Sequence, residues 1–333
     1  KTVTVNTGLD VNANAAASNL TSFVASADEA DITIAMGANS TTLTTAITAG
    51  NTGDYGTVTF TGSGNVNHAA LIANTSTYDA SALTGNVVMT GDLTGTGLTS
   101  VKTGSGNDTV LSGAVAITNI DLGAGTDSLT LDDDYDGLSV TLNGGTGSDT
   151  LKFVTGTKLS DLAATSSVTG FETIQLFHNS STQEIDASLL NDATYKITAS
   201  ATGATGSATV VIGSSDTDIN LASLVEATDV ANTVAAMTFI ADASANAAAI
   251  AYTGADGAKN TITGSASAGD VLTGGAKVDT FVVTSDGLLF NASNVMLDTF
   301  TGGAGTDIYS VGTAGVAFTI TADDVWSKST TVE

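Results

Sequence analysis

The chain of 333 residues has no cysteine, no proline and no arginine. A protein without cysteine can meet oxidants without forming disulfides, although this absence alone identifies no compartment. Its eight lysines face 34 acidic residues, which gives a net charge of −26 at pH 7. This balance argues against nucleic acid as a partner, because binding a phosphate backbone needs clustered Lys and Arg. The acidity instead suits divalent cations.

Aromatic residues are also scarce, at 5%, and only 13% of residues are charged. Small residues fill much of the chain, which favours thin stacked sheets over one large globular core. No membrane span is expected, because even the alanine-rich segment from Val230 to Ala251 contains Asp242 and several polar residues. We expect that segment to form a short helix or a pair of strands. The chain starts at Lys1 without a signal peptide, which predicts a fragment or a processed product.

The most specific pattern is a short glycine-rich stretch that ends in aspartate and leads into an apolar strand. Glycine can adopt positive φ and aim backbone carbonyl oxygens at one point, and aspartate adds a charged oxygen. Calcium binds several hard oxygens at once, so stacked turns would share an ion. The candidate metal ligands are Gly104, Gly106 and Asp108; Gly123, Gly125 and Asp127; Gly144, Gly145, Gly147 and Asp149; Asp270; Gly274, Gly275 and Asp279; and Gly302, Gly303, Gly305 and Asp307. The apolar residues two positions after the motif aspartates are Val110, Leu129, Leu151, Phe281 and Tyr309.

The spacing of the first three aspartates predicts how their turns stack. A regular parallel β-roll places aspartates about eighteen residues apart along one side. Asp108, Asp127 and Asp149 are 19 and 22 residues apart, so we interpret them as one side of three successive coils. Degenerate turns on the opposite side are expected at 119–121 and in the acidic run 132–136. We interpret the acidic run as a solvated loop, with a calcium site as the alternative.

A second block of turns is expected at 256–311. Asn260, Asp270 and Asp279 are 10 and 9 residues apart, which predicts both sides of a short roll, and Asp307 returns after an insertion at about 287–298. Lys277 stands where the motif has a glycine and adds a positive charge beside the proposed cation. The site at Asp279 is therefore expected to be weakened, reshaped or filled by the lysine itself.

These turns resemble the RTX nonapeptide repeat, G-G-x-G-x-D-x-U-x, of Gram-negative proteins exported by type I secretion. The stretches 144–151 and 302–309 match every fixed position. The phrases at 167–174, 79–83 and 186–190, with the run 263–283, resemble RTX-type bacterial S-layer proteins, in which x-G-[FI]-E-T and D-A-S-x-L recur between calcium motifs. This resemblance implies a secreted, extracellular protein that forms a lattice on the cell surface. Calcium would be needed for folding and assembly, the partners being further copies of the chain and outer-membrane polysaccharide.

The chain divides into four regions by motif content: a strand-rich N-terminal solenoid region at 1–100, a first RTX-like calcium block at 101–155, a β-rich intervening region at 156–255, and a second calcium block with the terminal segment at 256–333. Alternation of apolar with Thr, Ser or Asn residues predicts strands at 2–5, 31–34, 57–60 and 86–89. Only Asn12 to Ala27 has the pattern of a helix of useful length. The expected fold is all-β, a parallel β-solenoid or β-roll with calcium-binding turns.

Three classes of function fit this pattern to different degrees. A structural S-layer or surface-filament subunit needs a rigid repetitive body and acidic calcium turns, and we favour it. A secreted adhesin would add a ligand-binding module, for which 156–200 and 228–255 are candidates. A β-helix enzyme would need a base within an acidic groove, and Lys152 near Asp149 is a weak suggestion, so we expect no enzymatic activity and no catalytic residue. His68 and His178 are expected to be surface or packed residues.

Calcium is expected to couple binding to folding. Without the ion, carboxylates of neighbouring turns repel one another, and so acidic a chain has little opposing charge. Free calcium inside a cell is too low to fill weak sites. Outside, millimolar calcium would saturate sites with dissociation constants on the order of 10⁻⁴ to 10⁻³ M. The chain would therefore stay flexible during export and stiffen afterwards.

Overall fold

Alternating apolar and hydroxyl-bearing residues form short parallel strands in the computed structural model, which confirms the predicted all-β solenoid, of about 8 turns. The chain divides into two units, Lys1–Thr157 with Leu162–Thr173, and Lys158–Asp161 with Ile174–Glu333. The structure describes residues 2–5, 11–14, 22–25, 31–36, 38, 40–43, 47–51, 53–68, 72–90, 97–112, 117–131, 135, 138–154, 158–160, 163, 165–176, 182–191, 193–199, 207–226, 238–284, 296–311 and 329–330.

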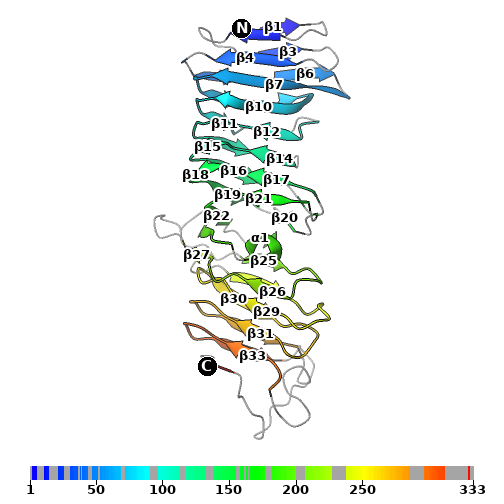
Figure 1. The fold of residues 1–333 in the computed structure, drawn as a ribbon, viewed down its shortest axis with the longest axis vertical. Coiled ribbons are helices and arrows are strands. Elements are labelled where there is room, and N and C mark those ends of the chain that lie inside the picture. The colour runs from blue at the N-terminus through cyan, green and yellow to red at the C-terminus, as the bar shows by residue number, and fades with distance from the viewer. Residues whose placement is uncertain are drawn as a thin grey trace. The chain divides into compact units, whose positions relative to one another are not determined.

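The first unit is built on two main sheets whose strands stack coil upon coil (Figure 1). One sheet has the order β1-β3-β6-β7-β10-β12-β14-β17-β21, with β2 and β4 joined through β7 and with β9 joined to β6; the other runs β19-β16-β13-β11-β8-β5, and β15 pairs with β18. The described pairs are parallel except β6 with β7. The strands are β1 (Thr2–Val5), β2 (Val11–Asn14), β3 (Ser22–Ala25), β4 (Ile32–Met36), β5 (Thr41–Leu43), β6 (Ile47–Asn51), β7 (Asp54–Gly62), β8 (Val66–His68), β9 (Ile72–Ala73), β10 (Thr75–Leu83), β11 (Val87–Met89), β12 (Ser100–Lys102), β13 (Thr109–Leu111), β14 (Asn119–Asp121), β15 (Ala124–Gly125), β16 (Ser128–Leu131), β17 (Thr141–Asn143), β18 (Thr146–Gly147), β19 (Thr150–Phe153) and β21 (Ser167–Thr169).

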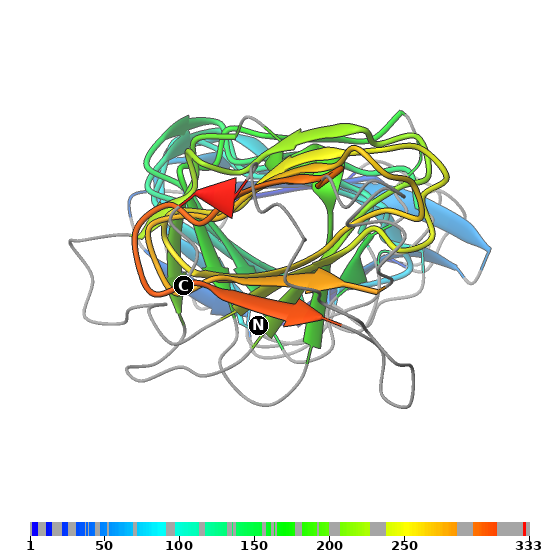
Figure 2. The same cartoon turned by 90° about the horizontal axis from the view of Figure 1, so that it is seen from below.

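The second unit repeats the plan with a seven-stranded sheet, β20-β23-β25-β28-β30-β32-β34, and a five-stranded sheet, β26-β29-β31-β33-β35. Figure 2 shows its yellow to orange strands on two sides of a flattened ring, joined by turns. The elements are β20 (Lys158–Leu159), β22 (Thr173–Leu176), β23 (Thr182–Asp186), α1 (Ala187–Leu190), β24 (Lys196–Ala199), β25 (Ser207–Val211), β26 (Asp218–Asn220), β27 (Val225–Glu226), β28 (Thr238–Asp242), β29 (Ala251–Thr253), β30 (Lys259–Thr263), β31 (Val271–Thr273), β32 (Thr280–Val283), β33 (Thr299–Thr301), β34 (Ile308–Val311) and β35 (Ser329–Thr330).

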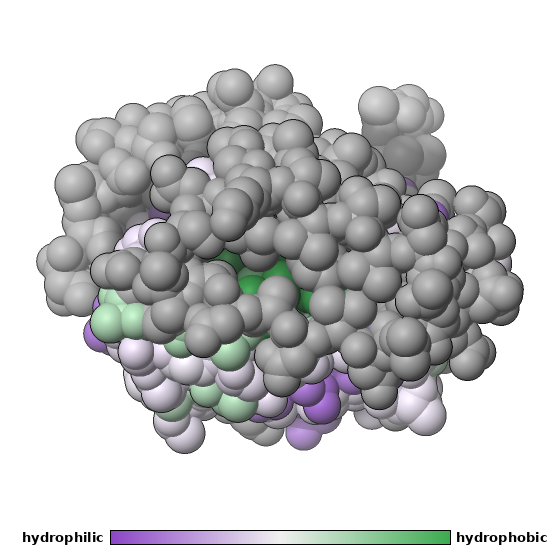
Figure 3. Space-filling model, turned by 90° about the horizontal axis from the view of Figure 1, so that it is seen from above, coloured by the Kyte–Doolittle hydropathy of each residue, from purple (hydrophilic) through white to green (hydrophobic). Residues whose placement is uncertain are grey.

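Apolar residues of successive coils lie opposite one another inside each coil. In the first unit the register aligns Tyr78, Val101, Ile120 and Leu142, and all four are fully buried or nearly so. Side chains alternate between the two faces of a strand, so a one-residue slip would turn this row outward. Hydrophobic side chains are visible toward the middle of Figure 3, with pale and purple residues along its lower edge. Burial of each large apolar side chain stabilises the fold by roughly 1.5–3 kcal/mol.

The D-A-S phrases form corners of the coil. An aspartate Oδ1 accepts the backbone N–H of the serine two residues later, at 3.0, 2.8 and 2.9 Å, and the alanine between them is fully buried. The three corners are Asp79-Ala80-Ser81, Asp186-Ala187-Ser188 and Asp242-Ala243-Ser244. Aspartate favours such turns because its side chain hydrogen-bonds the backbone nearby. These phrases therefore serve the fold.

The predicted strands at 2–5, 31–34, 57–60 and 86–89 are confirmed. The helix expected from Asn12 to Ala27 is wrong, since β2 and β3 occupy parts of that segment. The degenerate turn expected at 119–121 is also wrong: these residues form β14, and Asp121 Oδ1 accepts a hydrogen bond from Asn143 Nδ2. Within 230–251 the structure describes β28 and no helix in the described part. Asp132, Asp133, Asp134, Asp136, His178 and residues 285–295 lie outside the described residues.

The histidine expected to be a surface or packed residue is packed. His68 is 1% exposed, and its Nε2 lies 2.9 Å from the hydroxyl of Tyr78. Both rings also contact Phe60. Burial lowers the pKa of His68 to about 3, so the ring is neutral at physiological pH.

Candidate metal centre

Acidic side chains of successive coils form a hydrogen-bonded ladder in the first unit. We call Asp108, Asp127, Asp149 and Glu172 the acid ladder. One carboxylate oxygen of each acid accepts the backbone N–H at the same position in the preceding coil. The N···O distances are 2.6 Å from Val87 to Asp108, 2.7 Å from Asp108 to Asp127, 2.8 Å from Asp127 to Asp149 and 2.6 Å from Asp149 to Glu172. The predicted placement of the three aspartates on successive coils is confirmed.

The second oxygen of each ladder aspartate has no hydrogen-bond partner among the described residues. This holds for Oδ2 of Asp108, Asp127 and Asp149, whose side chains are at most 2% exposed. The hydroxyl of Thr103 and the backbone N–H of Gly104 lie beside the Asp108 carboxylate and act to lower its pKa, although the Thr103 hydroxyl donates its hydrogen to the Leu122 carbonyl oxygen at 2.6 Å. A buried polar atom without a partner is costly, and a buried carboxylate oxygen more so. Three such atoms on successive coils are therefore candidate ligands for a cation.

Burial raises the pKa values of the three aspartates in the acid ladder, and neighbouring negative charges add to the effect at Asp127 and Asp149. Burial raises the pKa of Asp127 to about 7, and the charges of Asp108 and Asp149 add to the effect. Burial also raises the pKa of Asp108, and it raises that of Asp149 together with the nearby charge of Glu172. The ion pair that the described residues show joins Lys158 to Glu184 at 3.5 Å and involves no ladder acid. The ladder therefore favours a bound proton or cation.

Glycines bring the turns that precede the ladder acids into direct contact. Gly145 and Gly147 have φ of 101° and 141°, and a Cβ there would lie 1.8 Å and 1.7 Å from the carbonyl oxygens of Gly123 and Gly125. No other residue type fits both the dihedral angle and the close approach. The same two carbonyl oxygens accept the backbone N–H groups of Thr146 and Ser148 at 2.8 and 3.2 Å. These contacts hold the carbonyl oxygens of Gly123 and Gly125 in place in the turn that precedes Asp127.

The second unit has a shorter ladder of Asn260, Asp279 and Asp307. Asp279 is fully partnered, because its Oδ1 accepts from the backbone N and Nδ2 of Asn260, both at 2.7 Å, and its Oδ2 accepts from Gly275 N at 2.6 Å. Asp307 Oδ1 accepts from Asp279 N at 2.8 Å, whereas its buried Oδ2 has no partner among the described residues. We call one acid of a ladder a rung, and we call an aspartate open when its Oδ2 has no partner among the described residues. In the second ladder only the Asp307 rung is open in this sense, like Asp108, Asp127 and Asp149 of the first unit.

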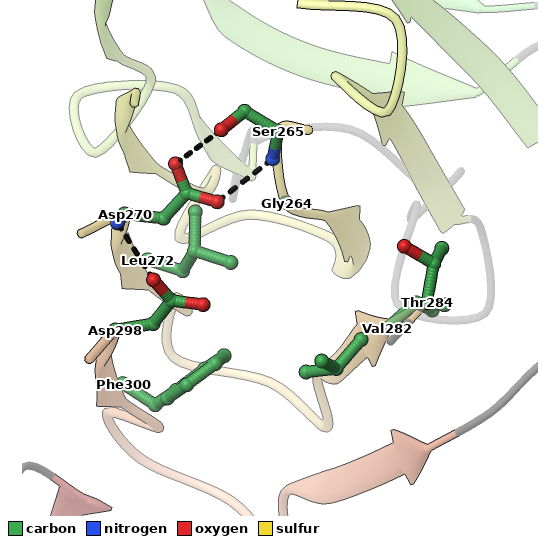
Figure 4. A pocket seen from close by; sticks show the side chains of 9 residues that line it. Gly264, Ser265, Asp270, Leu272, Val282, Thr284, Asp298 and Phe300 are labelled. Atoms are coloured by element: carbon green, nitrogen blue, oxygen red, sulfur yellow. Dashed lines mark hydrogen bonds between the residues drawn. The ribbon is translucent and has the colours of Figure 1, made fainter. Parts of the chain in front are cut away.

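Asp270 and Asp298 form another pair in the second unit (Figure 4). Asp298 Oδ1 accepts the backbone N–H groups of Gly269 and Asp270, at 2.6 and 2.9 Å. Asp270 is fully partnered: Oδ1 accepts from Ile250 N and Ser265 Oγ, and Oδ2 accepts from Ser265 N. The cavity beside them measures about 10 Å³, roughly the room for one water. It is lined by Gly264, Ser265, Asp270, Leu272, Val282, Val283, Thr284, Asp298 and Phe300.

The acids that the sequence singled out lie in hydrogen-bonded rows, each row within its own unit. Asp108, Asp127, Asp149 and Asp307 share one arrangement, with a bonded Oδ1 and an open Oδ2. The glycines differ more. The glycines of the 123–125, 145–147 and 303–305 turns have positive φ. Gly104, Gly106, Gly274 and Gly275 do not, but a Cβ added to any of them would lie within 2.6 Å of neighbouring backbone or side-chain atoms.

Sequence reasoning missed Glu172 and Asp298 as members of these hydrogen-bonded rows. The two sides of a short roll that it predicted at Asn260, Asp270 and Asp279 are confirmed, since Asn260 and Asp279 lie in one row and Asp270 lies in another. Asp298 had a usable signal, because 270–276 and 298–304 share the pattern D-x-apolar-T-G-G-A, 28 residues apart. Asn260 occupies the ladder position before Asp279, 19 residues away, with an amide in place of the acid. Glu172 was noted only for its resemblance to a family phrase, and its turn is too short for the glycine motif.

The donor set fits a hard cation. Within the described ranges, no three acidic or histidine side chains converge on one point. An ion held here would therefore use a carboxylate oxygen together with backbone carbonyl oxygens, each of which keeps a second lone pair. Calcium accepts such mixed oxygen sets at irregular geometry, whereas magnesium demands a near-ideal octahedron. A donor set made of the Oδ2 atoms and backbone carbonyl oxygens would thus suit calcium best.

Comparisons with models of protein families, with curated proteins and with solved structures found no match for this chain. Among the described residues, no helix combines the length and apolarity needed to cross a membrane. The fold and the acid ladder define the protein as a parallel β-solenoid with stacked acidic turns.

Proposed function

We propose that this protein is a structural subunit of a Gram-negative surface layer, a secreted solenoid that folds and self-assembles outside the cell with calcium. One observation carries the proposal: the buried, unpartnered Oδ2 atoms of aspartates stacked on successive coils. The residues that would hold calcium are Asp108, Asp127 and Asp149 in the first unit and Asp307 in the second, with carbonyl oxygens of the preceding glycine turns. Calcium supplies the positive charge that these carboxylates need when buried.

The repetitive body supports a structural role. Successive coils pair in register and stack apolar residues such as Val101, Ile120 and Leu142 in a continuous core, as in repeat proteins whose coils contact their neighbours. Four large apolar residues described in the second unit are exposed, at 40–47%: Val225, Val271, Val278 and Ile308. We propose that contacts between copies, in a lattice or a filament, use such outward surfaces. Polysaccharide of the outer membrane is the proposed anchor.

Calcium binding would stabilise the folded form by mass action. A ligand that binds only the folded state contributes roughly 2.7 kcal/mol per site at one hundred times its dissociation constant. Millimolar extracellular calcium would reach this range only for sites on the order of 10⁻⁵ M, while weaker sites on the order of 10⁻⁴ M still gain something. Several open rungs together would therefore make a large difference between the chain inside and outside the cell.

A metal count tests the proposal directly. The native protein and a variant with Asp108→Asn, Asp127→Asn and Asp149→Asn are dialysed against calcium, and the bound metal is measured by mass spectrometry. Asparagine keeps the Oδ1 acceptor and removes the charge, so the variant is expected to bind fewer ions. A control removes the same charge outside the ladder, at Asp31, Asp121 and Asp218. Equal calcium in the native protein and the ladder variant, or none in either, would overturn the proposal.

A further inference from the structure

We infer that Glu172 is a cation ligand that closes the acid ladder of the first unit and shares an ion with Asp149. This inference rests on the proposed function of the ladder as a calcium site. Glu172 belongs to the phrase Gly170-Phe171-Glu172-Thr173, which no glycine-rich motif announces. Its place in the fold follows from the backbone hydrogen bonds.

Glu172 occupies the ladder position one coil after Asp149. The carbonyl oxygen of Asp149 accepts the N–H groups of Glu172 and Thr173 at 3.0 and 3.1 Å. One coil earlier, the carbonyl oxygen of Asp127 accepts from Thr150 N, the residue after Asp149, at 2.9 Å. Thr173 therefore corresponds to Thr150, and Glu172 corresponds to Asp149. Like the aspartates, Glu172 also accepts the N–H of the preceding rung through its side chain, at 2.6 Å.

The shorter turn explains why this rung is glutamate. Asn143 pairs with Thr169, and five residues separate Asn143 from Asp149, whereas two separate Thr169 from Glu172. The preceding coil has the short strand β18 (Thr146–Gly147) in its turn. The two residues 170 and 171, both described by the structure, form no such strand. The backbone therefore takes a shorter path past the ladder. The additional methylene of glutamate lets the carboxylate reach the Asp149 N–H that an aspartate would meet in a full-length turn.

The charge of Glu172 is the step that points to an ion. Asp149 is fully buried, its Oδ2 has no partner among the described residues, and the Glu172 carboxylate is hydrogen-bonded to the Asp149 N–H at 2.6 Å. A glutamine would accept the same N–H without placing a second negative charge there. The chain does use an amide at the start of the second ladder, where Asn260 bonds the closed Asp279. Glu172 is also exposed, so an ion can reach this end of the ladder from solvent.

Glu172→Gln separates ligation from simple capping, because the amide keeps the hydrogen bond to the Asp149 N–H and loses the charge. Calcium binding to the full chain is measured by isothermal titration calorimetry at pH 8, with far-UV circular dichroism in chelator as the folding check. We expect the variant to fold as the native protein does without calcium. One of its sites should be lost or weakened by at least about tenfold, since calcium affinity follows ligand charge. Asp218→Asn, an exposed acid in β26, is the matched control.

Native-like stoichiometry and affinity in Glu172→Gln would overturn the inference, as would a β signal in chelator weaker than that of the native protein in chelator. Glu172→Asp tests the argument from reach: it keeps the charge but shortens the side chain, so it should bind as weakly as the glutamine variant. Native-like binding by Glu172→Asp would refute that argument. If the native protein itself binds no calcium, the proposed function fails, an outcome distinct from failure at Glu172 alone.

Discussion

Replacing Asp127 with asparagine perturbs the acid ladder at its middle rung. The Oδ1 of the new amide still accepts the Asp108 N–H, which lies 2.7 Å from Oδ1 in the native protein. The charge at the buried, unpartnered Oδ2 is lost. Asp127→Asn should raise the stability of the metal-free protein and lower that of the calcium-bound protein. The reason is that the buried charge destabilises the metal-free fold, whereas in the calcium-bound fold the carboxylate is a ligand.

The magnitudes follow from the environment of Asp127. Burial raises its pKa from 3.8 to about 7. At pH 8 without calcium, its charge therefore costs the fold up to about 4 kcal/mol, since one pKa unit corresponds to about 1.36 kcal/mol. The amide nitrogen at the place of Oδ2 would be unpartnered, at a cost of about 1–3 kcal/mol, so the net gain is roughly 1–3 kcal/mol. With calcium at a hundredfold excess over its dissociation constant, loss of one site removes about 2.7 kcal/mol.

Thermal unfolding at pH 8, followed by circular dichroism, measures both the stability gain in chelator and the stability loss in calcium. In chelator the Tm of Asp127→Asn should rise by several degrees, because 1 kcal/mol shifts Tm by about 2–4 °C for a unit of this size. In saturating calcium its Tm should fall below that of the native protein. Asp121→Asn, which removes a charge from a strand of the same coil, should show no such reversal. A lower Tm under both conditions would refute the reasoning and mark Asp127 as a structural residue.

Three further predictions concern other rungs, pH and the glycine turns. Asp307→Ala should reduce the difference in Tm between calcium and chelator more than Asp279→Ala does, because the oxygens of Asp279 are already partnered; equal reductions would contradict this ranking. In chelator, urea unfolding should show stability rising as pH falls from 8 to 5, because the folded protein binds protons on Asp127 with a pKa of about 7 and the unfolded chain near 3.8; a fall over this range would count against it. Gly147→Ala should cost several kcal/mol with or without calcium, since its Cβ would lie 1.7 Å from the Gly125 carbonyl oxygen; a urea midpoint close to native would disprove the turn geometry.

Much of the fold follows from patterns that the sequence displays directly. Separations of 19 and 22 residues placed Asp108, Asp127 and Asp149 on successive coils, and the structure links them by direct hydrogen bonds. Period-two alternation predicted strands such as β4 and β11 because each strand has one buried face. The apolar residues two positions after the aspartates, such as Val110 and Leu129, lie in the core for the same reason.

The partners of each carboxylate could not be predicted in the same way. Whether an aspartate is open or closed depends on residues one coil away, as when Asn260, 19 positions earlier, occupies Oδ1 of Asp279. Coil lengths vary with every turn, so the residue that lies above a given rung cannot be counted from a fixed repeat. Helix propensity misled the prediction for 12–27, where pairing with neighbouring coils favours strands instead.

The most direct test of calcium-dependent folding and assembly is a calcium titration of the chelator-treated protein, with far-UV circular dichroism and particle size followed together and magnesium as the control. The account predicts that calcium, and not magnesium, cooperatively raises the β signal and the Tm above those of the metal-free fold, and that growth in particle size follows. A β signal and particle size that stay the same with and without calcium would contradict it, and the glycine and aspartate turns would then be structural features of a calcium-independent solenoid.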